Sequence, residues 1–318
     1  MKRISDKIIQ AEKAVSPFIR ETPLEYSYPL SNELGCKVFL KLENLQVTGS
    51  FKARGAMNKV LSLQDDPREI ITASTGNHGL GVANALLACN KKGTIYLPKK
   101  ASAAKVEAIK QRGIPIEFHG DSGEVTEKYA RQLAIDTNKI YVSPYNDEEV
   151  IAGQGTIGVE LYNQQPDLDM VFVSIGGGGL IAGIAAYLKS VNPSITIVGC
   201  LPANAPVMYE CIQAGKVIDV PEQPTLSDGT AGGIDHDSIT FDMCKKLVDD
   251  YVLVSEEEIL NAMRMVLKHH HLIVEGSAGV AVASILQQKD KYQGKKVAAI
   301  ICGGNVSDAV LKKMVCDD

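Results

Sequence analysis

Short apolar runs alternate with amphipathic stretches along almost the whole chain, and this alternation constrains the fold more than any other feature. The runs have the length and composition of strands, and the stretches between them show a helical period of 3.6 residues. Strand-like runs lie at 37–43, 68–74, 93–98, 114–120, 139–144, 169–176, 195–202, 251–256 and 295–304. Strands that alternate with helices predict parallel sheets covered by helices on both faces, which is an α/β fold.

The runs form two series, which predicts two α/β domains. Residues 68–146 contain four strand-like runs and are expected to form a small domain. This block interrupts a large domain built from residues 1–67 and 147–318. No linker rich in Pro, Gly or Ser marks the joins between them.

Composition narrows the class of protein. The chain has 318 residues, with 33 Lys and Arg against 38 Asp and Glu, so its formal charge of −5 does not favour nucleic acid or an anionic membrane. Residues 1–15 are typical of an amphipathic helix and not of a signal peptide, and no apolar run is long enough to span a bilayer. The seven cysteines are scattered and odd in number, which favours a reducing compartment such as the cytoplasm.

Three glycine-containing loops follow strand-like runs, at 74–79, 174–183 and 302–305. Ligands bind at the carboxyl ends of the strands in open α/β sheets. Gly176 to Gly179 let a backbone approach a ligand closely, and the helix expected after them offers free N–H groups to an anion such as phosphate. No Walker lysine follows these glycines, and no G-x-G-x-x-G motif follows the first strand of the large domain, so a P-loop and a dinucleotide site are weaker interpretations.

Lys52 lies beside Phe51 among small and hydroxylated residues. A lone lysine is usually a solvated surface charge. An amine held near apolar surface and a helix N-terminus instead has its charged form disfavoured, and it is then free to form a Schiff base. Together with a phosphate loop, Lys52 therefore predicts a pyridoxal phosphate site.

Five motifs occur in order across nearly the full chain: KLENLQVTGSFKARGA, STGNHG, GQGTIGVE, GGGGLIAG and CGGN. In them the sequence resembles the fold type II pyridoxal-phosphate enzymes, whose fold is tryptophan synthase beta-like, and within these the threonine/serine dehydratase and serine racemase branch. The resemblance implies two three-layer α/β/α domains with mostly parallel sheets, a small domain that closes over the substrate, and a homodimer.

The resemblance also implies roles for individual residues. Lys52 would carry the cofactor and later act as the general base. The other implied cofactor contacts are Phe51, Asn77, Gly176, Gly177, Gly178, Gly179, Leu180 and Cys302, with Cys302 facing the pyridine nitrogen. The implied substrate contacts are Ser74, Thr75, Asn77, His78, Gln154 and Asp228. For Glu275, the resemblance implies a place at the cofactor edge, and a helix terminus is an equal alternative.

The activity implied is β-elimination from L-threonine and L-serine to a 2-oxo acid and ammonia. The main alternative is an amino-acid racemase, in which the hydroxyl of Thr75 would be the second base. The motifs are also compatible with a dehydratase of another β-hydroxy amino acid, as in ectoine utilisation, and less closely with a β-replacement enzyme. Outside these enzymes, a phosphate-ligand binding protein without catalysis would lack Lys52, and a nucleotide-binding oxidoreductase would bind a dinucleotide.

Two departures from the resemblance bear on ligands. Leu201 and Val207 stand where related racemases have acidic metal ligands, and neither side chain offers the oxygen that Mg²⁺ or Ca²⁺ requires. Val47 stands where animal racemases have a lysine for nucleotide. We therefore expect no metal at that position and no activation by ATP.

Overall fold

The computed structural model describes residues 2–74, 76–101 and 103–316, and their strands form two sheets. The larger sheet has the order β1-β2-β10-β7-β8-β9. Its strands are β1 (Leu24–Tyr26), β2 (Lys37–Lys41), β7 (Met170–Ser174), β8 (Thr196–Pro202), β9 (Asp250–Val254) and β10 (Lys296–Ile300). All neighbours are parallel except β1 and β2, and the register pairs Lys296 with Lys37 and Met170 with Thr196. The predicted α/β class with mostly parallel sheets is confirmed, and β1 is a strand that the sequence patterns did not predict.

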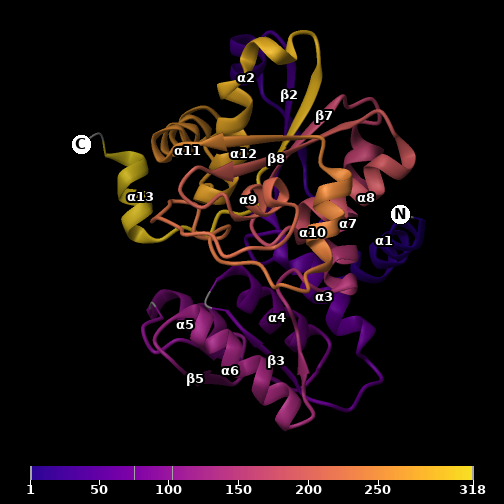
Figure 1. Ribbon diagram of the computed structural model, residues 1–318, viewed down its shortest axis with the longest axis vertical. Helices are drawn as coiled ribbons and strands as arrows, with labels where there is room; N and C mark the ends of the chain where they lie inside the picture. Colours follow the sequence, from indigo (N-terminus) through magenta and orange to yellow (C-terminus); the bar gives the residue numbers. More distant parts are fainter. Residues whose placement is uncertain (1, 75, 102, 317–318) are drawn as a thin grey trace.

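The helices of this larger part lie on both sides of its sheet, in the upper part of Figure 1. They are α1 (Lys2–Val15), α2 (Tyr28–Leu34), α3 (Lys52–Ser62), α7 (Glu148–Gln164), α8 (Gly179–Val191), α9 (Val207–Ala214), α10 (Ile239–Leu247), α11 (Glu256–His270), α12 (Gly276–Gln287) and α13 (Asp308–Val315). Short 3-10 turns cover Glu43–Leu45 and Lys289–Tyr292. The central strand β7 is buried along its whole length, as a strand with helices on both faces must be.

The smaller sheet is parallel, with the order β5-β4-β3-β6, and lies in the lower part of Figure 1. Its strands are β3 (Ile70–Ala73), β4 (Gly93–Leu97), β5 (Ile116–Phe118) and β6 (Ile140–Tyr141), and its helices are α4 (Asn77–Ala88), α5 (Ala103–Lys110) and α6 (Gly123–Asp136). The division of the chain at 67/68 and 146/147 into two domains stays a prediction, since the cores do not divide so simply. Met57 and Val60 of α3 and Val150 of α7 pack into the same cluster as Val82 and Ile95 of the smaller sheet's layers. Helix α7 also places Ile157 and Leu161 in the core of the larger sheet, so it packs into both cores, whereas the buried apolar residues of α3 pack only into the smaller one.

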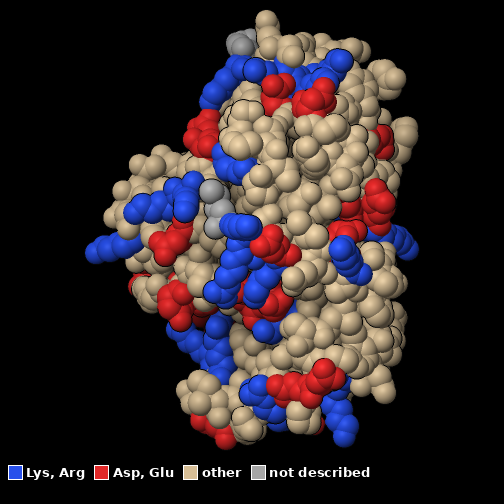
Figure 2. Space-filling view, turned by 90° about the vertical axis from the view of Figure 1, so that its right-hand side faces the viewer, with Lys and Arg blue, Asp and Glu red and all other residues tan. Residues whose placement is uncertain are grey.

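Surface charge agrees with the balanced composition. Figure 2 shows that blue and red side chains are interleaved on the face it presents, with broad areas that carry no charge. A nucleic-acid surface would instead show a continuous basic stripe. None of the helices in the described part of the chain combines the length and the apolar run that crossing a membrane requires.

Candidate active site

Lys52 is the first residue of α3, and strand pairing brings it to the end of β10. Because β2 and β10 are parallel neighbours, the segments that follow them leave the same edge of the sheet. Ser50 and Gly303 form an isolated bridge, and Phe51 N donates to Cys302 O at 3.0 Å. Residues from opposite ends of the chain are thus fixed side by side, as the cofactor contacts implied by the resemblance require.

The amine of Lys52 has two described neighbours. Its Nζ donates to Pro144 O at 2.7 Å and lies 5.1 Å from the centroid of the Phe51 ring. The residue as a whole is half-buried, but its amine end is enclosed, and this burial lowers the pKa of Lys52 to about 8 against the opposing charge of Glu275. About a tenth of the amine is therefore neutral at pH 7, far more than for a free lysine with a pKa of 10.5.

This lowered pKa predicts a pH profile for the cofactor-free chain. Only the neutral amine attacks an aldehyde, so the rate of covalent reaction between Lys52 and added pyridoxal phosphate should rise severalfold, up to about tenfold, between pH 7 and 9. Well above pH 8 the rate should level off, since the amine is then mostly neutral. Stopped-flow absorbance between pH 7 and 10 measures this rate. A rate that keeps rising steeply to pH 10 would show that Lys52 titrates like a surface lysine.

The four glycines link β7 to α8 in a tight turn. Gly178 has φ +83°, which is the left-handed region that favours glycine. A Cβ at Gly177 would lie 2.4 Å from the Tyr145 ring, and one at Gly176 would lie 2.9 Å from Thr230 Cα. Among the described residues no side chain caps the start of α8, which is 13 residues long, so its first N–H groups can bind a ligand. The turn has the form of an anion cradle.

Alanine at Gly178 should damage this cradle. A residue with a Cβ is strained at φ +83°, and this Cβ would also lie 2.9 Å from Met208 Cε. The backbone of the turn must therefore shift, and its amides move with it. We expect the dissociation constant for pyridoxal phosphate to rise roughly tenfold, the equivalent of about 1.4 kcal/mol. Titration of the cofactor-free variant measures it. Gly215→Ala is the matched control, because Gly215 has φ +72° at the end of α9 with no described atom within 4 Å of a Cβ. Equal affinities of the two variants would count against a ligand at the turn.

Glu275 and two asparagines form a polar cluster beside Cys302. Asn77 Nδ2 donates to both carboxylate oxygens of Glu275, at 2.9 and 3.0 Å, and Asn305 N donates to Glu275 Oε2 at 3.2 Å. Asn305 Nδ2 donates to Asn77 Oδ1 at 2.7 Å, which fixes the orientation of the Asn77 amide. Glu275 is also the residue before α12. The helix-terminus interpretation of Glu275 is therefore confirmed, and its place at the cofactor edge stays a prediction. Asn305 is a member of the cluster that the sequence patterns did not indicate.

The Cys302 thiol is buried at the end of β10. Ser174 Oγ donates to its Sγ at 3.6 Å, and Sγ lies 4.0 Å from Glu275 Oε1. Burial, and then the carboxylate of Glu275, raise the pKa of Cys302 above its ordinary value of 9.0, so the thiol is neutral. A neutral thiol is a weak partner for a pyridinium nitrogen.

The turn before α4 brings Ser74, Asn77 and His78 together, while Thr75 lies outside the described residues. Ser74 Oγ accepts from Gly76 N at 3.2 Å, and no side chain from the described residues caps the start of α4. His78 is buried with Nε2 3.1 Å from Val142 O, and its Nδ1 has no partner among the described residues. Burial, and then the charge of Lys52, lower the pKa of His78 to about 3, so its ring is neutral.

Gln154 and Asp228 occupy different environments. Gln154 is buried in α7, and its Oε1 accepts from Gly55 N at 3.1 Å, one turn after Lys52. Its Nε2 finds no partner in the described part of the chain. Asp228 is exposed, and the next residue, Gly229, lies against Ser277 Oγ and Glu275. Gln154 is thus hydrogen-bonded to the helix that Lys52 begins, and the substrate contacts of Gln154 and Asp228 stay predictions.

A buried ion network lies directly behind Lys52, and the sequence patterns did not predict it. Arg54 binds both oxygens of Glu43 at 2.7 Å and both oxygens of Glu160 at 2.6 and 3.0 Å. Lys41 Nζ donates to Glu160 at 2.5 Å and to Thr22 O at 2.7 Å. The side chains of Arg54, Glu43 and Lys41 are fully buried, so the network ties α3 rigidly to α7 and to the end of β2.

These features define a class of protein. The chain belongs to the family described as pyridoxal-phosphate dependent enzyme, whose pattern it matches over residues 15–303. It is 42% identical to the L-threonine dehydratase catabolic TdcB of Staphylococcus aureus strain N315, over 94% of this chain and 88% of the relative. The processed form of threonine deaminase isoform 2 from Solanum lycopersicum superposes with a TM-score of 0.93 and 32% identity, covering 99% of this chain and 93% of that one. Maize serine racemase gives a TM-score of 0.91 and 33% identity, covering 96% and 94%. The predicted family, fold type and cofactor are confirmed.

The described residues fit this cofactor. The glycine turn presents uncapped amides where any larger residue would collide with Tyr145 or Thr230, which suits a phosphate. Lys52 supplies an amine with a lowered pKa, and Cys302 a neutral thiol. No group of three or more His, Cys, Asp and Glu side chains among the described residues is arranged to hold a metal ion.

Proposed function

We propose that the chain is a pyridoxal-phosphate-dependent ammonia-lyase that converts L-threonine and L-serine to a 2-oxo acid and ammonia. The proposal rests mainly on one observation. Lys52 Nζ donates to Pro144 O, and the ring of Tyr145, the residue after Pro144, lies against the glycine turn. An amine and an anion cradle are thus held within reach of one small ligand. The relatives named as threonine dehydratase and threonine deaminase supply the substrate class.

In this proposal the backbone of Gly176, Gly177, Gly178, Gly179 and Leu180 holds the phosphate. Gly179 and Leu180 are the first two residues of α8, whose dipole adds to the attraction for a dianion. Phe51 and Asn77 would hold the pyridine ring, Asn77 through a hydrogen bond to the phenolic oxygen, and Cys302 would be the partner of the ring nitrogen. Because the Cys302 thiol is neutral, it would not stabilise a positive charge on the pyridine nitrogen, and the cofactor would be a modest electron sink, which suits elimination of a β-hydroxyl.

Lys52 would move the proton that starts the reaction. When bound, pyridoxal phosphate supplies an electron sink for the negative charge that develops at the substrate Cα. With its amine free and its pKa near 8, Lys52 takes the α-proton as a general base near neutral pH. The α-proton and the β-hydroxyl leave together as one water, and a second water hydrolyses the C=N bond of the resulting imine, so the net products are one 2-oxo acid and one ammonia.

The substrate carboxylate would bind at the start of α4. The uncapped N–H groups there, and the hydroxyl of Ser74, are donors that suit a carboxylate. The His78 side chain offers less than the resemblance implied, because its ring is neutral and its Nε2 already faces Val142 O. We therefore assign the carboxylate to the backbone at residues 76–78 and to Ser74 and Asn77. The role of Thr75 stays a prediction.

Gln154 and Asp228 remain proposed substrate contacts of different kinds. Gln154 Oε1 already accepts from Gly55 N, while its Nε2 has no partner among the described residues, so we assign the substrate contact to Nε2. Asp228 is exposed, and its neighbour Gly229 lies close to Glu275, which supports a contact between Asp228 and the β-hydroxyl of the substrate at the rim of the site.

The proposal is tested by product analysis. Purified protein is loaded with pyridoxal phosphate and incubated separately with L-serine and L-threonine, and 2-oxo acid, ammonia and D-serine are measured in the same samples. Stoichiometric 2-oxo acid and ammonia with little D-serine supports the lyase. D-serine in excess of 2-oxo acid, reduced by Thr75→Ala, would make the chain a racemase, which its likeness to maize serine racemase also favours. If neither amino acid gives any of these products, both the lyase and the racemase assignments are overturned.

Assembly and location belong to the same proposal. The interleaved surface charge in Figure 2 gives no reason to expect a nucleic-acid partner on that face. A homodimer in the cytoplasm is what the resemblance and the scattered, reduced cysteines favour. Size-exclusion chromatography with light scattering measures the oligomeric state.

A further inference from the structure

The segment that joins β6 to α7 touches both halves of the proposed cofactor site. This connecting segment, residues 143–147, leaves the smaller sheet at Tyr141 and enters α7, which supports both sheets. Ser143 Oγ accepts from Asn146 N at 3.0 Å and so holds the segment in a tight turn. Within the turn, Pro144 O accepts the hydrogen bond from Lys52 Nζ.

The ring of Tyr145 covers the glycine turn. The ideal Cβ of Gly177 would lie 2.4 Å from two atoms of the ring, and that of Gly179 would lie 3.1 Å from Tyr145 Cβ. On another side of the turn, Thr240 Oγ1 donates to Gly177 O at 2.6 Å. Tyr145 therefore fills the space that a side chain at Gly177 would need and packs directly against the turn.

A chain of polar contacts connects Tyr145 to the smaller sheet's helix α6. The Tyr145 hydroxyl accepts from Asp235 N at 2.8 Å, and Asn146 Nδ2 donates to Asp235 Oδ2 at 3.2 Å. The same carboxylate oxygen accepts from Arg131 Nη2, in α6, at 2.9 Å. Asp235 belongs to the larger part of the chain, so this ion pair bridges the two parts.

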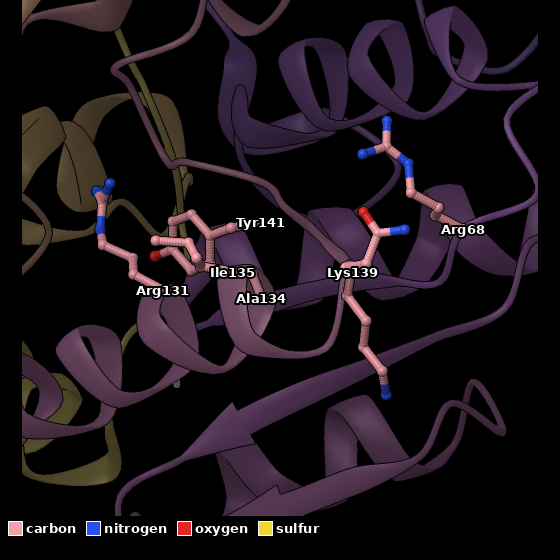
Figure 3. A pocket seen from close by; sticks show the side chains of 7 residues that line it. Arg68, Arg131, Ala134, Ile135, Lys139 and Tyr141 are labelled. Atoms are coloured by element: carbon pink, nitrogen blue, oxygen red, sulfur yellow. The ribbon is translucent and has the colours of Figure 1, made fainter.

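Arg131 is well placed for such a bridge. Figure 3 shows its side chain beside Tyr141, and its guanidinium lies 4.6 Å from the centroid of that ring. Arg131 also pairs with Glu127 at 2.8 Å, and about a third of its side chain is exposed. The pocket in Figure 3 has two further cations, but Arg68 pairs with Asp66 and Lys139 with Glu69, so we assign no anion to it.

We propose that Tyr145 is a positioning residue that couples the packing of α6 against the 235–239 loop to the shape of the phosphate turn. When α6 contacts the larger part, Arg131 holds Asp235, Asp235 holds the Tyr145 hydroxyl, and the ring holds the turn. When α6 moves away, the hydroxyl loses its fixed partner and the turn loses its cover. This inference rests on the glycine turn being the phosphate site of the proposed function, and it goes beyond that function.

The experiment measures the dissociation constant of pyridoxal phosphate for the cofactor-free forms of the parent, Tyr145→Phe, Arg131→Gln and the double variant. Each single variant removes one link of the chain, so affinity should fall roughly two- to tenfold. Because the links act in series, the double variant should bind no more weakly than the weaker single variant. The coupling would be overturned if the dissociation constant of the double variant rises by the product of the two single effects. It would also be overturned if the single variants bind like the parent.

A second measurement separates positioning from general stability. In the parent, added pyridoxal phosphate should slow amide exchange in residues 235–246, and in Arg131→Gln this protection should shrink. Undiminished protection would contradict the coupling. Lys128→Ala is the matched control on α6, because its pair with Glu124 is exposed on both sides and it should bind like the parent. If Gly178→Ala binds like the parent, the proposed phosphate site fails. If it binds weakly while Tyr145→Phe does not, only this inference fails.

Discussion

Replacing Lys52 with alanine is expected to reduce formation of 2-oxo acid from L-threonine by about 10²–10⁴-fold or more, because a positioned general base contributes that much on its own. The variant removes the enclosed amine. Its pKa of about 8 is the property of the site that most strongly indicates a catalytic role for Lys52 and not a structural one. The glycine turn is untouched, so the variant should still bind pyridoxal phosphate, but without a covalent bond. Activity assays and absorbance spectra of the dialysed protein measure the two properties separately.

Two further variants sharpen this result. Lys52→Arg keeps the positive charge beside Phe51 but offers no amine of suitable pKa, so it should be as inactive as Lys52→Ala. Lys59→Ala removes a lysine two turns further along α3, where it pairs with Asp147, and should retain activity. Substantial activity in Lys52→Ala, under conditions where the parent is active, would refute the assigned role and with it the proposed mechanism.

Much of the architecture could be predicted from the sequence because parallel strands leave a strong pattern. Met170–Ser174 is buried throughout and Lys296–Ile300 is buried after its first residue, and both are strands of the larger sheet. The strand Leu24–Tyr26 has no such pattern. It is three residues long, antiparallel and at the edge of the sheet, where one neighbour is enough to hold it.

The cofactor residues could be predicted because a lysine and clustered glycines at strand ends form a recognisable set of motifs. Local patterns do not say which strand ends are neighbours. The bridge between Ser50 and Gly303 and the bond from Phe51 N to Cys302 O depend on the order β2-β10-β7, which is a long-range property of the folded sheet. The place of Asn305 in the polar cluster depends on the same order, although this residue follows directly after the glycines of CGGN.

Buried charges are the part that local patterns represent least well. Arg54, Glu43 and Glu160 look like ordinary surface residues of helices and turns. Lys41 carried a usable signal, since it ends the apolar run VFLK of a strand that lies inside the sheet. A lysine in such a place needs a carboxylate partner, but nothing in the sequence says which one.

Replacing Arg54 with methionine is therefore expected to destabilise the protein strongly. The network of Lys41, Arg54, Glu43 and Glu160 has two charges of each sign, and the variant leaves one buried carboxylate uncompensated. Breaking a buried pair in this way costs about 3–5 kcal/mol. Urea denaturation of the cofactor-free chain measures the loss. Arg3→Ala is the control, since Arg3 pairs with Glu148 at the surface and should change stability by less than about 1 kcal/mol.

Two additional measurements separate charge from packing in this network. In the double variant Arg54→Met/Glu43→Gln the remaining charges are balanced, so part of the lost stability should return. Burial alone would raise the pKa of Glu160, but Arg54 and Lys41 hold it below 4.5, so its contribution is complete above pH 4.5 and is lost as the pH falls through the lowered value. The stability gap between the parent and Arg54→Met should thus narrow as the pH falls below 4.5. A gap that is constant with pH, together with a double variant no more stable than the single one, would mean that Arg54 supports α3 by its shape and not by its charge.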